Sequence, residues 1–164
     1  MAESLIPEES RALIGQLLSD PLTAMVVTAD AQRYAYAAGD LNPLYFDEDF
    51  AKSHGYRGLV CPPTFVNYAI VRDKPLTELR TDGLYRAGGR NIPLRVARSM
   101  FGGEEWDFIE TVYMGDTITA ESRLLSLDEK DGGSGPFVLT TRQTTFTNQD
   151  GRIVARTRQV GISR

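Results

Sequence analysis

The chain has only one cysteine, Cys61, and one histidine, His54. A single cysteine excludes an internal disulfide and a cysteine metal cluster, and a zinc site would depend mostly on carboxylates, which is uncommon. We therefore expect no metal. A thiol–imidazole nucleophile would also need a third group to orient it. We expect Cys61 to be a small buried apolar side chain and His54 to cap a helix end.

Long apolar runs and basic clusters are also missing. Apolar runs such as Ala24–Val27 and Gly58–Cys61 fall far short of the roughly 18 residues that cross a bilayer, so we expect no membrane segment. The formal charge of −4 and pI near 5.1 argue against nucleic-acid binding. The acidic start lacks the features of a secretory signal, so a cytoplasmic location is expected.

The overall composition is that of an ordinary folded protein. Of the 164 residues, 41% are hydrophobic and 24% are charged, which suits one domain with a substantial core. We expect a single domain over residues 1–164. Residues 1–21 are expected to form a helical extension, because Pro7–Leu18 spaces its apolar residues at three and four.

The part before residue 72 predicts one strand and several short helices. Leu22–Ala29 is rich in β-branched residues and indicates a strand. The next elements are a helix over 31–38 with Asp30 as N-cap and Gly39 at its end, a turn at Asn42–Pro43, and a helix from Asp47 to Ala51. Residues 64–71 follow two prolines and are apolar nearly all round, so they predict a buried central helix. Residues 72–91 indicate a loop.

From Ile92 onward the apolar pattern has a period of two. The predicted strands are Leu94–Phe101, Glu104–Tyr113, Thr117–Leu127, Phe137–Asn148 and Arg152–Ile162, with turns at 102–103, 114–116, 132–135 and 148–151. A buried helix followed by long antiparallel strands predicts an α+β fold in which a curved sheet wraps the helix.

Three motifs, in order along the chain, support a family resemblance. They are AGDLNPLYFD at 38–47 with GYRGLVCPPTF at 55–65, VYMGDTI at 112–118, and NQDGRIVAR at 148–156. These motifs resemble those of the MaoC-like (R)-specific enoyl-CoA hydratases and dehydratases. They are most similar to the N-terminal, fatty-acid-synthase-like type of MaoC dehydratase domain. The resemblance implies a hot-dog fold with an antiparallel sheet of five to six strands, which usually pairs with a second hot dog.

The resemblance also implies a set of catalytic positions. In complete family members, an Asp-x-Asn-Pro-x-His motif holds the water that adds across an enoyl thioester. Asp40 matches the carboxylate and Asn42 the turn, but Tyr45 stands where the histidine would be. A phenol with a pKa near 10 donates a hydrogen bond at neutral pH but is a poor base. A site without the imidazole would lose on the order of 10²–10⁴ in rate, so Tyr45 is expected to be vestigial.

A second departure affects the donor for the thioester oxygen. Pro62 stands at or next to the family's donor glycine, and proline has no N–H. The N–H groups of Thr64 and Phe65 at the helix start are possible replacements. With these positions matched, we expect Phe46, Pro62, Pro63, Thr64 and Phe65 to bind substrate.

Each feature also has a structural interpretation. Asp40 can simply cap the turn that follows it, and Tyr45 and Phe46 can be packing residues. The loose basic stretch formed by Arg80, Arg86, Arg90, Arg95 and Arg98 can contact the phosphates of coenzyme A, although a solvated loop is the favoured interpretation.

The function implied by the resemblance is that of a subunit of an (R)-specific enoyl-CoA hydratase or 3-hydroxyacyl dehydratase. It would bind acyl-CoA or acyl-carrier thioesters, use no cofactor beyond the thioester substrate, and be active as a hetero-oligomer with a catalytic MaoC-like subunit. Two alternatives remain open. One is a non-enzymatic acyl-CoA-binding hot-dog homodimer, and the other is a self-sufficient hydratase that uses Asp40 and Tyr45.

Overall fold

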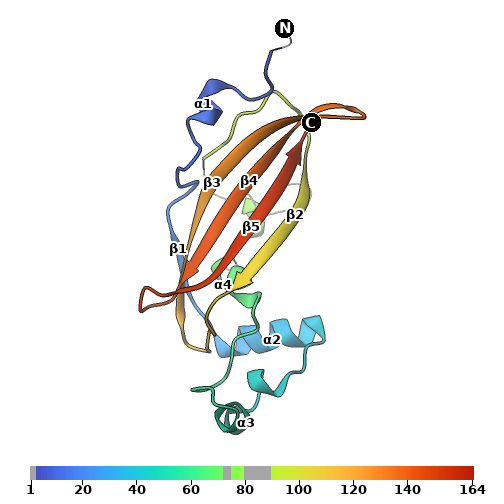
Figure 1. Cartoon of the computed structure of the whole chain (residues 1–164). Coiled ribbons are helices and arrows are strands. Elements are labelled where there is room, and N and C mark those ends of the chain that lie inside the picture. Colours follow the sequence, from blue (N-terminus) through green and yellow to red (C-terminus); the bar gives the residue numbers. More distant parts are fainter. Residues whose placement is uncertain (1–2, 72–74, 80–89) are drawn as a thin grey trace.

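The computed structural model describes residues 3–71, 75–79 and 90–164. Within these residues, antiparallel strands form one five-stranded sheet in the order β1-β3-β4-β5-β2. The strands are β1 (Leu22–Met25), β2 (Ser99–Phe108), β3 (Thr117–Gly132), β4 (Gly135–Thr147) and β5 (Ile153–Ser163). Figure 1 shows both chain ends at one end of the sheet and the helices α2 (Thr28–Ala38) and α3 (Glu48–Ser53) at the other.

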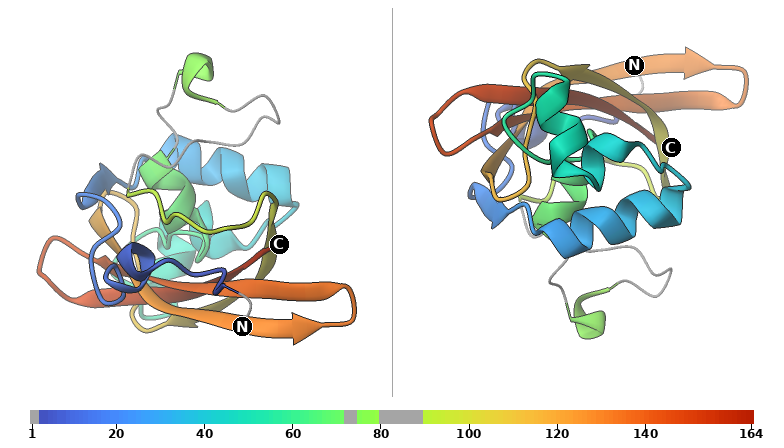
Figure 2. Two further views of the ribbon diagram at one scale, coloured as in Figure 1. Left: turned by 90° about the horizontal axis from the view of Figure 1, so that it is seen from above. Right: turned by 90° about the horizontal axis from the view of Figure 1, so that it is seen from below.

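The expected central helix is α4 (Phe65–Val71), which packs against β1 and β3. Figure 2 shows α4 and α2 on the same face of the curved sheet. Phe65, Val66 and Ala69 are buried, whereas Asn67 and Tyr68 are exposed. The α+β hot-dog prediction is confirmed, but the helix is buried on one face only. We call the sheet face toward α4 the inner face.

Two apolar clusters lie between the inner face of the sheet and the segments that pack on it. The larger one surrounds Phe65 and Phe146 and includes Cys61, which is buried as predicted. Burial raises the pKa of the Cys61 thiol, so it stays protonated and inert. The smaller cluster joins Ile6 and Leu18 of the N-terminal segment to Leu124 and neighbouring residues of the sheet. Together, these clusters attach the helical end and the N-terminal segment to the same sheet.

The predicted turn at 102–103 is wrong. Residues 99–108 form one strand, β2, with a bulge between Phe101 and Gly103. A Cβ on Gly102 would lie 2.9 Å from the Val160 carbonyl oxygen and 3.0 Å from Ile162. Glycine is therefore needed here because β5 approaches closely, which a sequence pattern does not distinguish from a turn.

The N-terminal helix is shorter than predicted. The structure forms α1 only over Glu8–Arg11. Farther along, the N–H groups of Gly15 and Leu18 donate to carbonyl oxygens of β3, at Leu124 and Ser122. Pairing with the sheet replaces the helical hydrogen bonds, because a short helix has little stability of its own.

The boundary between β1 and α2 also differs from prediction. β1 ends at Met25 and α2 begins at Thr28, with Val27 rather than Asp30 at the N-cap. Asp30 lies instead in the first turn, where a carboxylate is favourable, and pairs with Arg33 at 3.1 Å.

Other local predictions are confirmed. The turns at 114–116, 133–134 and 148–151 are present. Most of the predicted loop over 72–91 lies outside the described residues, which include there only 75–79, with the short helix η2 (Leu76–Glu78), and 90–91. No helix in the described part of the chain is long and apolar enough to span a membrane.

Candidate functional site

The loop after α2 is shaped by local hydrogen bonds that the sequence predicts. Gly39 ends α2 with a φ of 71°, a left-handed conformation that suits glycine. Asn42 Oδ1 accepts from the Leu44 N–H at 3.1 Å and starts the short helix η1 (Pro43–Tyr45). Asp47 Oδ1 accepts from the Phe50 N–H at 2.9 Å and starts α3, as expected. These contacts hold residues 40–47 in a defined loop.

The structure brings Asp40, Asn42 and Tyr45 together in this loop. Asp40 is exposed, and its Oδ1 accepts from the Asn42 N–H at 3.2 Å, which is the contact expected of a turn cap. Tyr45 is only 6% exposed. Burial raises the pKa of Tyr45, and the negative charge of Asp40 and a hydrogen bond to that carboxylate raise it further. Tyr45 therefore remains a protonated donor at neutral pH and cannot act as a base.

Tyr45 is also part of a packed cluster. Its neighbours include Ala35 and Val60, and its carbonyl oxygen accepts from Gln32 Nε2 at 3.0 Å. Phe46 is half-buried against Tyr36, with ring centres 4.8 Å apart. The loop is thus well packed at the end of the molecule that holds α2 and α3.

The start of α4 leaves one free backbone donor of the two expected. The Phe65 N–H donates to the Pro62 carbonyl at 2.9 Å, so it is already used. Within the described residues, the Thr64 N–H has no hydrogen-bond partner. The Thr64 hydroxyl lies 2.9 Å from the Tyr34 hydroxyl, and Tyr34 packs edge-on against the Phe65 ring. Pro62 is buried and has no N–H to offer.

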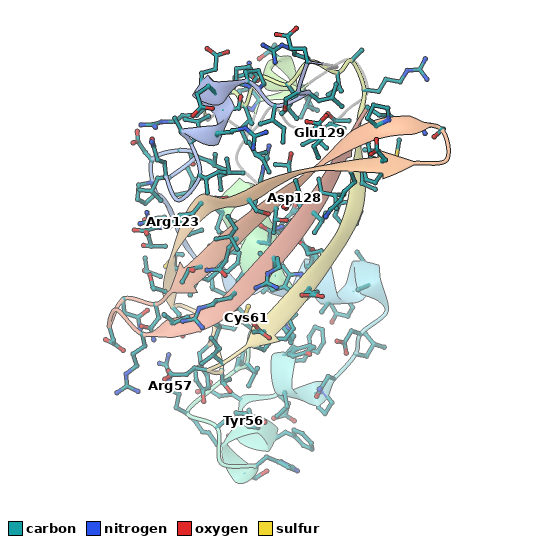
Figure 3. The ribbon with its side chains drawn as sticks, turned by 45° about the horizontal axis from the view of Figure 1, so that its top comes forward. Tyr56, Arg57, Cys61, Arg123, Asp128 and Glu129 are labelled. Carbon is teal, nitrogen blue, oxygen red and sulfur yellow. The ribbon has the colours of Figure 1, made fainter. Side chains whose placement is uncertain are left out.

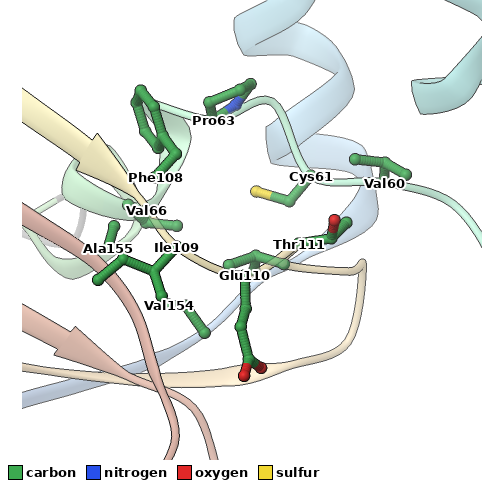
Figure 4. Close-up of a pocket in the computed structure, with 11 residues that line it drawn as sticks. Val60, Cys61, Pro63, Val66, Phe108, Ile109, Glu110, Thr111, Val154 and Ala155 are labelled. Carbon is green, nitrogen blue, oxygen red and sulfur yellow. The ribbon is translucent and has the colours of Figure 1, made fainter.

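A cavity of about 220 Å³ lies between the start of α4, the chain after β2 and the start of β5. Pro63, Val66, Phe108 and Ala155 are among its mostly apolar lining residues, as Figure 4 shows. The carboxylate of Glu110 points away from Pro63 and Phe108. Ligand pockets usually have about 300–1,000 Å³, so this cavity alone accommodates only part of an acyl chain.

The sequence did not reveal a buried network around Asp116, which is 4% exposed. Its carboxylate accepts from Arg57 Nη2, from Gln149 Nε2 at 3.1 Å and from the Tyr113 N–H at 2.9 Å. The Arg57 guanidinium also lies over the Tyr113 ring, 4.1 Å from its centre. In Figure 3, Arg57 lies beside Tyr56 at the helical end, and Cys61 lies closer to the strands. The network connects three chain segments through Arg57, Asp116 and Gln149. Each of these residues lies in one of the family motifs, and this was the only indication of the network in the sequence.

Other predicted positions have structural roles. His54 Nδ1 lies 2.8 Å from the Phe50 carbonyl oxygen, which confirms the expected helix cap. Arg90 and Arg95 contact Gln16 and Glu3 of the N-terminal segment. Arg80 and Arg86 lie outside the described residues. In the described part of the chain, no cluster of three His, Cys, Asp or Glu residues is placed to hold a metal ion.

Comparison with known proteins relates this geometry to a family. The family model for the FAS1-like, dehydratase domain region matches residues 12–157. A UPF0336 protein of Mycobacterium tuberculosis (strain ATCC 25618 / H37Rv) is 28% identical over 149 residues, which cover 91% of this chain and 82% of that protein.

Two solved structures have the same fold. A chain of the ChsH1-ChsH2 complex from Mycobacterium tuberculosis superposes with a TM-score of 0.71 at 18% identity, covering 94% of this chain and 90% of that chain. A chain of the C-terminally truncated HadBC (3R-hydroxyacyl-ACP dehydratase) complex from Mycobacterium tuberculosis gives 0.65 at 21% identity, covering 92% and 96%.

The family match includes the loop with Asp40 and Tyr45, the start of α4 and most of the sheet. These are the regions that carry the three motifs. The chain therefore belongs to the family of the FAS1-like dehydratase domain region.

Proposed function

We propose that this chain is the substrate-binding half of an (R)-specific enoyl-CoA hydratase or 3-hydroxyacyl dehydratase, and that a catalytic MaoC-like partner supplies the acid and base. The main support is Tyr45. Hydration needs a base for water, an acid for the α-carbon and a donor for the developing enolate oxygen. Tyr45 is buried, and burial and the nearby Asp40 carboxylate raise its pKa, so Tyr45 does not supply the base that an imidazole would supply.

The start of α4 also supports a site in which this chain binds substrate and the partner supplies catalytic groups. Because the Phe65 N–H is bonded to the Pro62 carbonyl, Thr64 is the remaining backbone donor of the expected pair. One donor on a short helix is a weak substitute for a preorganised oxyanion site. The small apolar cavity suits part of an acyl chain, and a partner surface would complete it.

The edge of the sheet supports a partner of a different sequence. Among the described residues, β2 pairs only with β5, which leaves its outer edge unpaired. Phe101, at 65% exposure, and Phe108 add apolar surface near this edge. The same strand carries Glu104, Glu105 and Asp107, so pairing with a basic strand is favoured over pairing with a like-charged copy. The ChsH1-ChsH2 and HadBC structures are themselves complexes, which supports a hetero-oligomer here.

The test measures hydration of crotonyl-CoA and a longer enoyl-CoA by the purified chain, by a candidate MaoC-like partner sought among the products of neighbouring genes, and by the two together. We expect turnover only from the mixture. Asp40→Asn should leave that turnover nearly unchanged, whereas replacing the partner's histidine should abolish it. Asp47→Asn is the matched control for Asp40→Asn. It makes the same chemical change in the same loop and should also leave the turnover unchanged, because asparagine caps a helix well. Full turnover by this chain alone, lost in Asp40→Asn, would instead establish the self-sufficient hydratase.

A further inference from the structure

The inner face of the sheet changes from apolar to polar partway along β4 and β5. Phe146 and Ala155 are paired in register and lie in the apolar core. Side chains two residues apart point to the same face of a strand, so the next two rows also face inward. These rows are Trp106, Thr157 and Thr144, and then Glu104, Gln159 and Arg142. We call Thr144, Thr157, Arg142 and Gln159 the polar band.

Thr157 is one sign that the polar band is incomplete in the isolated chain. Its side chain is 5% exposed, and its hydroxyl has no hydrogen-bond partner among the described residues. Most buried hydroxyls in proteins are satisfied, because an unpaired one loses its water without compensation. The position therefore has an unused donor and acceptor that faces the interior.

Arg142 is a second sign. Its side chain is half-buried, and burial lowers its pKa. Across residues 3–71, 75–79 and 90–164 it has no hydrogen bond or ion pair. Glu104 lies on the same face but two strands away, and its Oε2 accepts from Trp106 Nε1 at 2.9 Å. A guanidinium removed from water without a partner is unfavourable, so this position suits an incoming anion.

The two groups are close enough to share one ligand. Gln159 is directly opposite Arg142 on the neighbouring strand. Thr157 is therefore the diagonal neighbour of Arg142, with about 7–8 Å between the two backbones. An arginine side chain spans this gap. A carboxylate has two oxygens, so it can accept from the guanidinium with one and from the Thr157 hydroxyl with the other.

In strand register, the polar band follows two residues that line the cavity. Phe108 and Ala155, which line the cavity, are paired in the row immediately before Trp106 and Thr157. Arg142 and Gln159 are one row farther, about 13–14 Å along the strands from Ala155. An acyl chain that enters through the cavity and follows the inner face would bring its far end to this band.

We propose that Arg142, Thr157 and Gln159 form a subsite for a carboxylate at the far end of the acyl chain, so that the preferred thioesters derive from dicarboxylic acids. This inference rests on the proposed function, because it takes the cavity as the entry for the acyl group. It adds a substrate class that the family motifs do not specify.

The test compares decanoyl-CoA with the coenzyme A monothioester of decanedioic acid by calorimetry, on the chain and on its complex with the partner. Charge-assisted hydrogen bonds to a half-buried arginine should make the diacid thioester bind about 10- to 100-fold more tightly. Arg142→Met should remove this preference and leave the Kd of decanoyl-CoA nearly unchanged. Thr157→Val should weaken only the diacid thioester, by about 3- to 10-fold.

Arg123→Met is the matched control. Arg123 pairs in register with Gln143, so it lies on the opposite face of the sheet from Arg142, and it bonds Glu121 at 3.3 Å. It should keep the full preference. Thermal unfolding checks the fold, and Arg142→Met should be as stable as the original chain or more stable, because it removes an uncompensated buried charge.

The outcomes separate the two proposals. Equal affinity of the original chain for both thioesters, or a preference that survives Arg142→Met, would overturn the subsite and leave the proposed function standing. If Arg142→Met unfolds, the isosteric Thr157→Val variant decides, and an unchanged preference there overturns the subsite. Binding of neither thioester, by chain or complex, would overturn both proposals.

Discussion

Replacing Asp116 with alanine should destabilise the protein markedly although the residue lies outside the cavity. The Asp116 carboxylate is 4% exposed and accepts from Arg57, Gln149 and the Tyr113 N–H. The Arg57 side chain is 59% exposed, so the ion pair itself contributes less than about 1 kcal/mol. The larger loss comes from the part-buried Tyr113 N–H, because a donor left without its acceptor away from water costs about 1–3 kcal/mol.

We expect Asp116→Ala to lower the free energy of unfolding by about 2–3 kcal/mol, measured by urea denaturation. Asp116→Asn retains one acceptor oxygen for Tyr113, so its loss should be about half as large. Asp128→Ala is the control, because Asp128 is exposed and, among the residues that the structure describes, accepts only from Ser126, at 2.7 Å. Its effect should stay within about 0.5 kcal/mol.

The refuting result is equally specific. If Asp116→Ala and Asp128→Ala unfold at the same urea concentration with the same slope, the network does not stabilise the fold. Amide hydrogen exchange gives a second readout. The Cys61 N–H donates to the Val112 carbonyl at 2.8 Å, next to this network, and it should exchange faster in Asp116→Ala than in the control.

Two further predictions concern single residues. The raised pKa of Tyr45 means that its contribution to stability is fully present below its ordinary pKa of 10.0 and is lost as the pH rises through the higher folded value. Alkaline unfolding should therefore lose part of its pH dependence in Tyr45→Phe, and an unchanged alkaline profile would contradict the raised pKa of Tyr45. Gly102→Ala should destabilise by about 1–3 kcal/mol, because its Cβ would meet the Val160 carbonyl at 2.9 Å. Gly103→Ala has open space and is the control, so equal unfolding temperatures for the two variants would refute the role of close packing.

The proposed supporting role is based on several features that occur together. A tyrosine in place of an imidazole would slow a hydratase by itself. The Phe65 N–H donates to the Pro62 carbonyl, so it is not free to bind the thioester oxygen. The cavity is also small for a complete acyl chain. The partner that we propose, docked at the β2 edge that no other described strand covers, would compensate for each shortfall.

Several features were predictable because short-range physics determines them. The end of α2 at Gly39 and the caps made by Asn42 and Asp47 depend only on neighbouring backbone groups, and all three are present in the structure. The period-two pattern after Ile92 likewise indicated the sheet, since alternation follows from strand geometry. The family motifs added the hot-dog topology.

Sequence alone was a poorer guide wherever a distant segment competes with local preference. Pro7–Leu18 has a helical pattern, but its second half pairs with β3, because sheet hydrogen bonds compensate for the lost helical ones. The glycines at 102–103 look like a turn, but the approach of β5 explains Gly102.

The sequence by itself thus determined the fold family, the capped loop around Asp40 and the loss of the histidine at Tyr45. Only the tertiary structure decided which groups meet. It paired Tyr45 with Asp40, buried Asp116 under Arg57, and aligned Arg142 with Gln159 beside the unpaired Thr157 hydroxyl. Such contacts depend on strand register and on burial, and both are properties of segments that are far apart in the chain.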